Sequence, residues 1–298
     1  MTVQHALLAA AETLRSAGVD SPRLDAELLL AHVLGVSRTQ LLVHPEQELS
    51  EAQARAFEMH RDWRATRVPL PYLTGTREFF GRAFFVNQQV LIPRPETETL
   101  VEAVLGWQPP GFTAHPTLLD VGTGSGCIAI SLALGLPGSR VIGMDLSGKA
   151  LEVARRNADA LGAARVELRE ARFPEGVEDL EEVLDILVSN PPYIGPDESL
   201  DLPPEVRDFE PQEALYAGDC GLEVIQSLLD NASRLLKPGG LLALEVGFRQ
   251  APEVLRRAQK AGLASPRAVR DLSGIERVVL AERPAQPRRS PEQPPNHA

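Results

Sequence analysis

The chain has 298 residues, of which 43% are hydrophobic and 24% are charged, and its formal net charge at pH 7 is −11. These values are typical of a soluble globular protein with room for about two domains. An acidic chain has no general attraction for phosphate backbones, because non-specific nucleic-acid affinity depends on Lys and Arg. We therefore expect a protein or small-molecule partner and no direct binding of nucleic acid.

The sequence lacks the patterns of secretion, membrane insertion and structural metal binding. Glu12 and Arg15 interrupt the first apolar stretch, which indicates an amphipathic helix instead of a signal peptide. No apolar run reaches the length of a membrane span. Cys127 and Cys220 form no CxxC pair and no His/Cys cluster, so we expect no metal and interpret both as buried thiols. The prediction is a cytoplasmic monomer without membrane contact.

Residues 1–72 are predicted to form a small bundle of four or five short helices. Apolar residues recur at helical spacing in the first two helices, and Gly18 ends the first. Ser21 and Pro22 are expected to begin the second helix, and Ser50 with Gln53 resembles a capping box for a later one. The predicted buried residues of these two helices are Val3, Leu7, Ala11, Leu14, Leu24, Leu28, Ala31 and Leu34. This bundle carries no catalytic constellation, so it is either a packing domain or a docking platform for a partner.

Residues 73–95 are predicted to form a β-hairpin that links two domains. Phe79 and Phe80 precede Gly81, and Phe84 and Phe85 follow it, which is typical of two aromatic strands around a tight turn. A helix is expected to open at about Glu96.

Residues 96–283 alternate between apolar strands and amphipathic helices, which predicts a mostly parallel sheet covered on both faces. The fold class is therefore α/β, with a Rossmann-like, doubly wound domain. The expected strands are 117–121, 140–145, 165–170, 184–190, 240–246 and 276–282, and the expected helices are 127–136, 149–162, 221–236 and 251–262. Residues 284–298 hold five prolines and no apolar period, which predicts a disordered tail.

A glycine-rich turn follows the first strand of this domain. Glycine lets a backbone turn tightly and approach a ligand closely, and the next helix offers free N–H groups. Such a turn is typical of several cofactor sites and is a weak signal by itself. The predicted cofactor-binding residues here are Asp120, Gly122, Thr123, Gly124, Ser125 and Gly126.

Asp145 narrows the choice of possible cofactors. It ends the second strand, where a carboxylate can accept hydrogen bonds from both ribose hydroxyls of an adenosine, although it could instead cap the next helix. NAD and S-adenosylmethionine both fit this arrangement. The spacing Gly122-x-Gly124-x-Gly126 differs from the GxGxxG usual for NAD and favours S-adenosylmethionine, with S-adenosylhomocysteine as product.

The segment Asn190-Pro191-Pro192-Tyr193 follows the fourth strand, which should lie beside the first. The Asn190 side-chain oxygen and the Pro191 carbonyl can accept the two hydrogens of a planar NH₂ group, and Tyr193 can pack against its plane. This arrangement would position a poor nitrogen nucleophile for attack on a methyl sulfonium. We predict Asn190, Pro191 and Tyr193 as catalytic residues, and all four residues of the segment as the substrate site. Asn190 is also a predicted cofactor contact.

Several longer segments resemble the peptide chain release factor N5-glutamine methyltransferases, the PrmC/HemK family. They are "PYLTGTREFFGRAFFVNQQVLIPRPETETLVE", "LDVGTGSGCIAISLA", "SNPPYIG", "FEPQEALYAGDCGLEVI" and "LALEVGFRQ". The resemblance implies methyl transfer from S-adenosylmethionine to the glutamine amide nitrogen of a Gly-Gly-Gln loop, with release factors as partners. It places Arg94, Glu96 and Glu98 in a family segment, as a salt-bridged hinge or as cofactor contacts.

One stretch departs from the family. Ala171 and Arg172 stand where the family usually has an Asp-Trp pair that resembles an adenine contact. Arg172 could stack on the adenine through its guanidinium plane or stem, or Phe173 could cover a ring face. Both are predicted cofactor contacts.

Three other functions fit parts of the pattern. N5-glutamine methylation of a ribosomal protein uses the same chemistry. Adenine-N6 methylation of nucleic acid shares the Asn-Pro-Pro-Tyr motif, but the sequence offers no basic groove for it. A non-catalytic cofactor-binding adaptor has no need of Asn190.

Overall fold

A computed structural model describes residues 1–109, 112–195, 202–218 and 221–285. The predicted disordered tail lies mostly outside these residues, and Cys220 lies outside them entirely. The chain divides into two compact units. The first comprises residues 1–93 and 197–215, and the second comprises residues 94–196 and 216–298. No helix among the described residues is long and apolar enough to cross a membrane.

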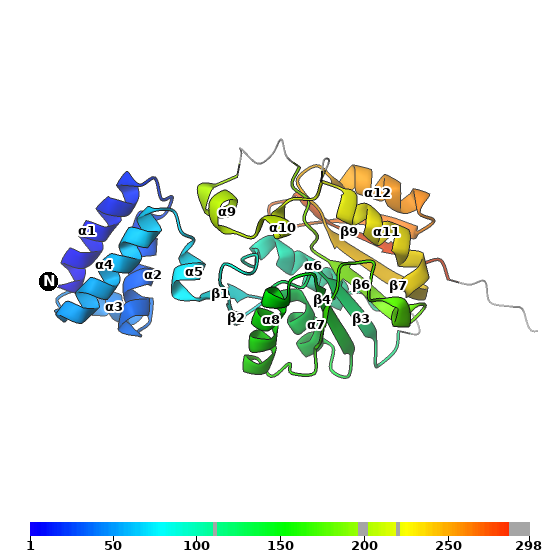
Figure 1. Ribbon diagram of the computed structural model, residues 1–298, viewed down its shortest axis with the longest axis horizontal. Helices are drawn as coiled ribbons and strands as arrows, with labels where there is room; N and C mark the ends of the chain where they lie inside the picture. Colours follow the sequence, from blue (N-terminus) through cyan, green and yellow to red (C-terminus); the bar gives the residue numbers. More distant parts are fainter. Residues whose placement is uncertain (110–111, 196–201, 219–220, 286–298) are drawn as a thin grey trace, which may run out of the picture. The chain divides into compact units, whose positions relative to one another are not determined.

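The first unit begins with five helices, as the sequence predicts (Figure 1). They are α1 (Val3–Ser16), α2 (Pro22–Leu34), α3 (Arg38–Val43), α4 (Glu51–Ala65) and α5 (Leu70–Thr74). The capping box is confirmed, because the Ser50 side chain accepts from the Gln53 backbone N–H and the Gln53 side chain accepts from the Ser50 N–H. Ser21 occupies the N-cap position of α2 without a capping side-chain bond.

The predicted apolar face of α2 is confirmed at Ala31, which is buried, and is wrong at Leu24. Leu24 is exposed, whereas Ala26, Leu29 and Leu30 are fully buried in the bundle core. The buried face also includes a carboxyl group, because Asp25 turns inward and accepts a hydrogen bond from the buried Arg64 of α4. An apolar period could not reveal a buried face that includes an ion pair.

The aromatic hairpin is present. Strands β1 (Thr76–Phe79) and β2 (Arg82–Phe85) pair antiparallel across a two-residue turn at Phe80 and Gly81, both of which have positive φ. Phe79 and Phe84 are fully buried and meet edge to face.

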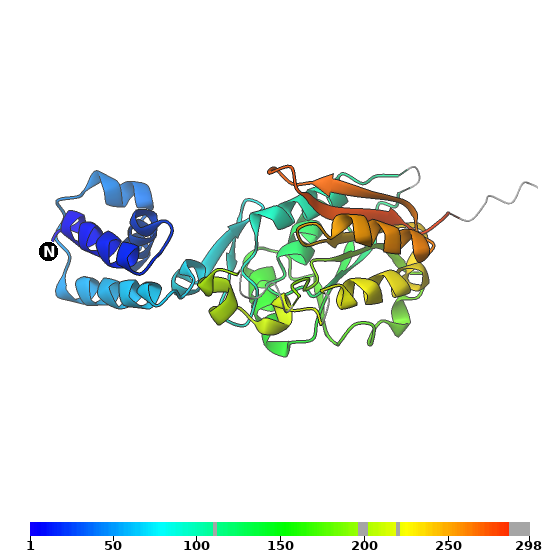
Figure 2. The ribbon, with the colours of Figure 1, turned by 90° about the horizontal axis from the view of Figure 1, so that it is seen from above.

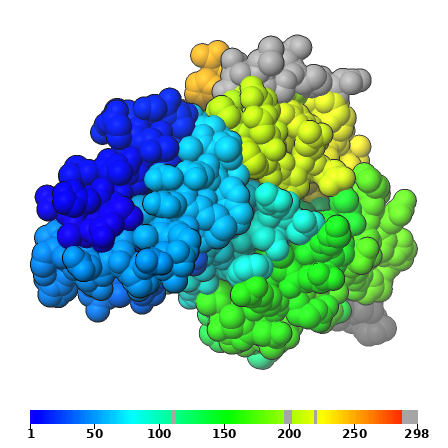
Figure 3. Space-filling model, turned by 60° about the vertical axis from the view of Figure 1, so that its left-hand side comes forward, coloured from blue at the N-terminus to red at the C-terminus, as the bar shows by residue number. Residues whose placement is uncertain are grey.

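Two short helices of the first unit come from much later in the chain. They are α9 (Pro204–Phe209) and α10 (Gln212–Leu215), neither of which the sequence predicted. Glu205 of α9 accepts hydrogen bonds from Arg64 of α4 and from Arg67, two residues beyond that helix. Glu210 accepts from the Ile92 backbone N–H. Figure 3 shows the yellow-green residues of α9 against the light blue surface of the helices.

The second unit is built on a seven-stranded sheet with the order β5-β4-β3-β6-β7-β9-β8. The first five strands of that order run parallel, and β9 and β8 pair antiparallel at one edge. Strand β3 lies beside β6, which confirms the predicted neighbourhood of the glycine turn and the Asn-Pro-Pro-Tyr segment. The strands are β3 (Thr117–Val121), β4 (Arg140–Asp145), β5 (Glu167–Glu170), β6 (Leu184–Ser189), β7 (Leu236–Glu245), β8 (Ala264–Arg270) and β9 (Glu276–Glu282).

The sequence missed β8. Its residues are mostly half-exposed and include Pro266, Arg267 and Arg270, so it has no apolar run to mark it. An edge strand tolerates proline and charge because one of its backbone edges needs no partner.

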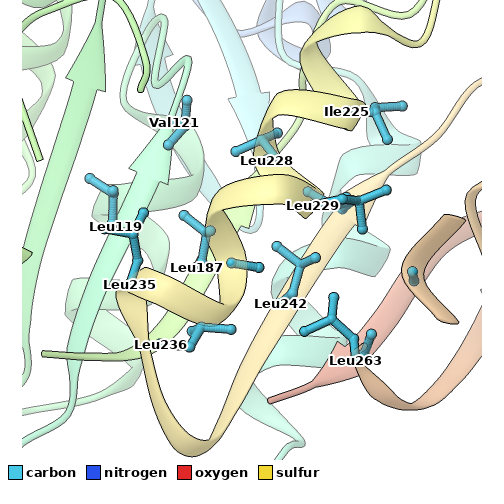
Figure 4. Close-up of a cluster of buried hydrophobic side chains, with 14 of the residues drawn as sticks. Leu119, Val121, Leu187, Ile225, Leu228, Leu229, Leu235, Leu236, Leu242 and Leu263 are labelled. Atoms are coloured by element: carbon cyan, nitrogen blue, oxygen red, sulfur yellow. The ribbon is translucent and has the colours of Figure 1, made fainter. Parts of the chain in front are cut away.

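Helices cover both faces of the sheet (Figures 1 and 2). On one face α6 packs on α7, and α7 packs on α8; on the other α11 packs on α12. The second face holds a core in which Leu119, Val121, Leu187 and Leu242 of the strands meet leucines of α11 (Figure 4). The helices are α6 (Glu98–Leu105), α7 (Cys127–Gly135), α8 (Gly148–Ala160), α11 (Glu223–Leu235) and α12 (Ala251–Lys260).

Candidate active site

The glycine-rich turn connects β3 to α7 and has the geometry of a ligand cradle. Gly122, Gly124 and Gly126 all have positive φ, a backbone conformation that other residues rarely adopt. A Cβ built on Gly122 or Gly124 would meet no described atom within 4 Å, whereas one on Gly126 would lie 2.9 Å from Ile130. Gly126 therefore permits packing of the turn on its own domain, and the other two glycines leave an open backbone surface.

Asp120 lies beneath this turn. It is fully buried, and its Oδ2 accepts from the Thr123 hydroxyl at 2.7 Å and from the Ala129 N–H at 3.2 Å. Burial raises the pKa of Asp120 to about 7, while the bond from Thr123 acts in the opposite direction. Ser125 is also buried, and its carbonyl accepts from the Asn157 side chain. These predicted cofactor residues hold the turn in shape and leave the open surface to the glycines.

Asp145 ends β4 beside the glycine turn. Its Oδ2 accepts from the Gly124 N–H at 2.8 Å, and its Oδ1 accepts from the Ser147 N–H at 3.0 Å. Ser147 is the residue that caps α8, through its own hydroxyl. A carboxylate oxygen can accept more than one hydrogen bond, and the contact of Asp145 with ribose hydroxyls stays a prediction.

The residues after β5 lie next to Asp145. The Ala171 N–H donates to the Asp145 carbonyl, which brings this loop to the same sheet edge. Arg172 is exposed, and Phe173 is half-buried against the core. Their contacts with an adenine stay predictions.

The Asn-Pro-Pro-Tyr segment leaves β6 at the same edge. The Ser189 hydroxyl donates to the Val121 carbonyl at 2.6 Å and ties the end of β6 to the end of β3. Asn190, Pro192 and Tyr193 are half-buried and Pro191 is buried. The predicted substrate residues thus begin directly beside the strand that carries the glycine turn. Burial raises the pKa of Tyr193 to about 12, so its hydroxyl is neutral at ordinary pH.

Residues from two later segments of the sequence pack around Tyr193. Gln250 donates from Nε2 to the Tyr193 carbonyl at 3.0 Å and accepts the Gly247 N–H on its Oε1. A Cβ on Gly221 would lie 2.6 Å from the Tyr193 carbonyl oxygen, and one on Gly247 would lie 3.0 Å from its ring. A Cβ on Gly221 would displace the Tyr193 backbone, whereas one on Gly247 would press on the Gln250 side chain and the Tyr193 ring.

Asn190 is held by the segment that begins α6. Its Nδ2 donates to the Thr97 hydroxyl at 3.2 Å. Thr97 is 2% exposed and also hydrogen-bonds to Glu245 at the end of β7, which is 1% exposed. Burial raises the pKa of Glu245 to about 7, against the effects of Thr97 and Arg277.

The sequence reasoning did not identify Thr97, Gly221, Glu245, Gly247 or Gln250 as site residues. All five lie in segments that carry the family resemblance, which was their only signal. The described residues contain no cluster of three or more His, Cys, Asp or Glu side chains that could hold a metal.

The chemistry of the site matches the adenosine and methyl donor of S-adenosylmethionine. An open glycine backbone, a carboxylate at the next strand end and a half-buried amide lie at successive strand ends, and ligands of open α/β sheets bind at this edge. A methyltransferase from Pyrococcus furiosus has a similar fold, with a TM-score of 0.51 and 19% identity over 69% of this chain and 91% of its own. Residues 113–262 match the family profile described as a methyltransferase domain. Fold and site therefore define an S-adenosylmethionine-dependent methyltransferase.

Similar proteins indicate a more specific family than the fold and site do. Residues 5–75 match the PrmC N-terminal domain. The chain is 42% identical to a release factor glutamine methyltransferase of Cereibacter sphaeroides, over 96% of this chain and 100% of that protein. It is 45% identical to one of Moorella thermoacetica, over 95% and 99%. The chain belongs to the release factor glutamine methyltransferase family.

Proposed function

We propose that this protein transfers a methyl group from S-adenosylmethionine to the side-chain nitrogen of the glutamine in a release factor's Gly-Gly-Gln loop. The observation that carries the proposal is the half-buried Asn190 at the end of β6, beside the strand of the glycine turn. An amide in that position can accept hydrogen bonds from a planar NH₂ group and can orient it toward a cofactor on the glycine backbone.

The cofactor would be held by the backbone of Gly122 and Gly124 and by the Asp145 carboxylate, with Phe173 or Arg172 beside the adenine. When bound, S-adenosylmethionine supplies a methyl group on a positively charged sulfur. The buried Asp120 and Thr123 keep the turn open for it.

The chain's own residues position the nucleophile. Asn190 Oδ1 and the Pro191 carbonyl accept the two hydrogens of the glutamine NH₂, and the Tyr193 ring packs on the amide plane. With the cofactor bound, the nitrogen lone pair would form the new N–C bond and the electrons of the broken C–S bond would go to sulfur. The extra proton then leaves the nitrogen to water, so the site needs no strong base.

The test supplies the protein with methyl-labelled S-adenosylmethionine and one of three acceptors: a release factor, large-subunit ribosomal proteins, or DNA. Mass spectrometry then locates the label. We expect it on the glutamine of the Gly-Gly-Gln loop. Label on a ribosomal glutamine or on DNA adenine would assign one of the alternative substrates, and cofactor binding without label on any acceptor would favour the adaptor.

A further inference from the structure

The Asn190 amide must point its oxygen toward the substrate, and an isolated asparagine has no reason to prefer that orientation. Its NH₂ and its oxygen have nearly the same shape, so only hydrogen-bond partners distinguish the two rotations of the amide. If the amide were flipped, a donor would face the hydrogens of the substrate nitrogen. The site therefore requires a neighbour that accepts from Asn190 and does not donate to it.

Thr97 is that neighbour. Its hydroxyl oxygen lies 3.2 Å from Asn190 Nδ2, and the threonine is 2% exposed. A hydroxyl can donate one proton and accept others, so by itself it would be compatible with either rotation of the amide. Its role depends on where its own proton goes.

The Thr97 hydroxyl directs its proton toward Glu245 in a hydrogen bond. The carboxyl group is 1% exposed and hydrogen-bonded to the Thr97 side chain, and its Oε2 has no partner among the described residues, which leaves Oε1 as the acceptor. An ionised carboxylate can only accept hydrogen bonds, so its hydroxyl partner must donate. With Glu245 ionised, the Thr97 hydroxyl therefore donates to the carboxylate and presents only lone pairs to Asn190.

We propose that Thr97 and Glu245 are positioning residues that fix the rotation of the Asn190 amide, so that its oxygen faces the substrate nitrogen. This inference rests on the proposed function. It assigns a role within residues 92–98, the family segment of Arg94, Glu96 and Glu98, to Thr97 instead of to these charged residues. Thr97 and Glu245 touch neither substrate nor cofactor in this account. They act through Asn190, from the start of α6 and the end of β7.

The first test removes the hydroxyl and keeps the shape. Thr97→Val in the full-length protein should lower kcat on a release factor about 10- to 100-fold, because a misoriented group costs that much in a positioned reaction. The cofactor Kd should change less than about twofold, because the lost interaction serves the substrate step. Thr97→Ser keeps the hydroxyl and should restore kcat to within a few-fold of wild type. Thr99→Val, the same change at a half-buried position of α6, is the matched control and should behave as wild type.

The second test needs no acceptor protein and therefore separates this inference from the proposed function. In the wild-type protein, the Asn190 side-chain NH₂ protons should exchange with water at least about tenfold more slowly than those of an exposed asparagine, since one is hydrogen-bonded to the buried Thr97. NMR measures this exchange, and Asn190→Asp assigns the signal by removing it. Protection should be lost in Thr97→Val and kept in Thr97→Ser.

The outcomes are distinct. A wild-type protein that methylates no release factor but protects the Asn190 amide overturns the proposed function and supports the inference. A wild-type protein that methylates the release factor while Thr97→Val and Thr97→Ser are equally active overturns the inference. An unprotected Asn190 amide in the wild-type protein also overturns it, whether or not the valine variant folds.

Discussion

Asp120 and Glu245 are two buried carboxyl groups on the same face of the sheet, and each holds a threonine hydroxyl under a loop of the site. Asp120 is on β3 and bonds Thr123 of the glycine turn; Glu245 is on β7 and bonds Thr97 behind Asn190. Strand pairing aligns Asp120 with Ala243, and residues two apart on a strand share a face. Burial raises the pKa of both to about 7, and each has one oxygen without a described partner.

The two groups differ in where their partners come from. Both donors to Asp120 lie within nine residues of it along the chain, so a single strand–turn–helix unit builds the cofactor loop. The partner of Glu245 is Thr97, almost half the chain away, and Thr97 in turn bonds Asn190. The cofactor loop is thus a local structure, whereas the substrate loop requires the whole sheet unit to be folded. Four predictions test that difference.

The largest expected effect is on Asn190. Asn190→Ala removes the proposed acceptor and should lower kcat by about 100-fold or more, the cost of losing one preorganised polar group. The cofactor Kd should stay within a few-fold of wild type because the glycine turn is untouched. Steady-state kinetics and calorimetry measure the two quantities. An unchanged kcat would remove the proposed role of Asn190, even in a protein that methylates release factors.

The second prediction concerns the charge on Asp120. Because the folded-state pKa is raised from 3.8 to about 7, the folded protein holds this proton more tightly than the unfolded chain. Stability therefore falls as pH rises from about 4 to about 7, and the loss is complete above that. Asp120→Asn keeps an acceptor for Thr123 and Ala129 but cannot ionise. Relative to wild type it should gain about 1 to 3 kcal/mol of stability between about pH 5 and about pH 8, at about 1.4 kcal/mol per pKa unit.

Urea denaturation at the two pH values measures this gain. Asp159→Asn, at an exposed position of α8, is the control and should shift stability equally at both. A gain in the control as large as that in Asp120→Asn would show that the effect does not come from burial.

The third prediction isolates the open face of the glycine turn. Gly124→Ala has room for its Cβ, and its positive φ costs about 1 to 2 kcal/mol for an alanine, so the variant should fold. The new methyl group lies where the cofactor backbone contact is proposed, so the cofactor Kd should rise about tenfold with kcat at saturation little changed. Gly162→Ala is matched, with φ of +74° and no described atom within 4 Å of its Cβ, in the turn after α8. Equal cofactor affinity in the two variants would contradict the cradle.

The difference between local and distant partners also explains which parts of the site could be predicted from the sequence. Strands with continuous apolar runs, the glycine turn and Asp145 were predictable because strand ends and turns are marked by adjacent residues. The neighbouring of β3 and β6 followed from the usual order of such sheets. Thr97, Glu245 and Gln250 could not be found from local patterns, because each acts on a residue tens to more than a hundred positions away. The apolar pattern did not reveal that Arg64 and Asp25 are buried, because charged residues in a sequence are normally interpreted as exposed.

The smallest expected effect concerns Glu205, a carboxylate whose pKa is shifted in the opposite direction to that of Asp120. Burial alone would raise the pKa of Glu205, but the hydrogen bonds from Arg67 and Arg64 outweigh it, and the pKa is lowered. Its stabilisation is therefore present above the unfolded-state pKa and is lost as pH falls, the reverse of Asp120. Glu205→Gln should lower stability by about 1 to 3 kcal/mol at neutral pH, the cost of a mostly buried charged hydrogen bond, and by less in acid.

A matched exposed pair sets the scale for this last effect. Glu167 accepts both of its bonds from Arg140 across β4 and β5, with both side chains nearly half exposed. Glu167→Gln should cost less than about 1 kcal/mol, because solvent screens an exposed pair. Denaturation of both variants at neutral and acid pH measures the difference, and kcat should stay within about threefold of wild type in each, since neither group belongs to the proposed reaction. If Glu205→Gln destabilised the protein more in acid than at neutral pH, the sign assigned to this carboxylate would be wrong, and so would its contrast with Asp120.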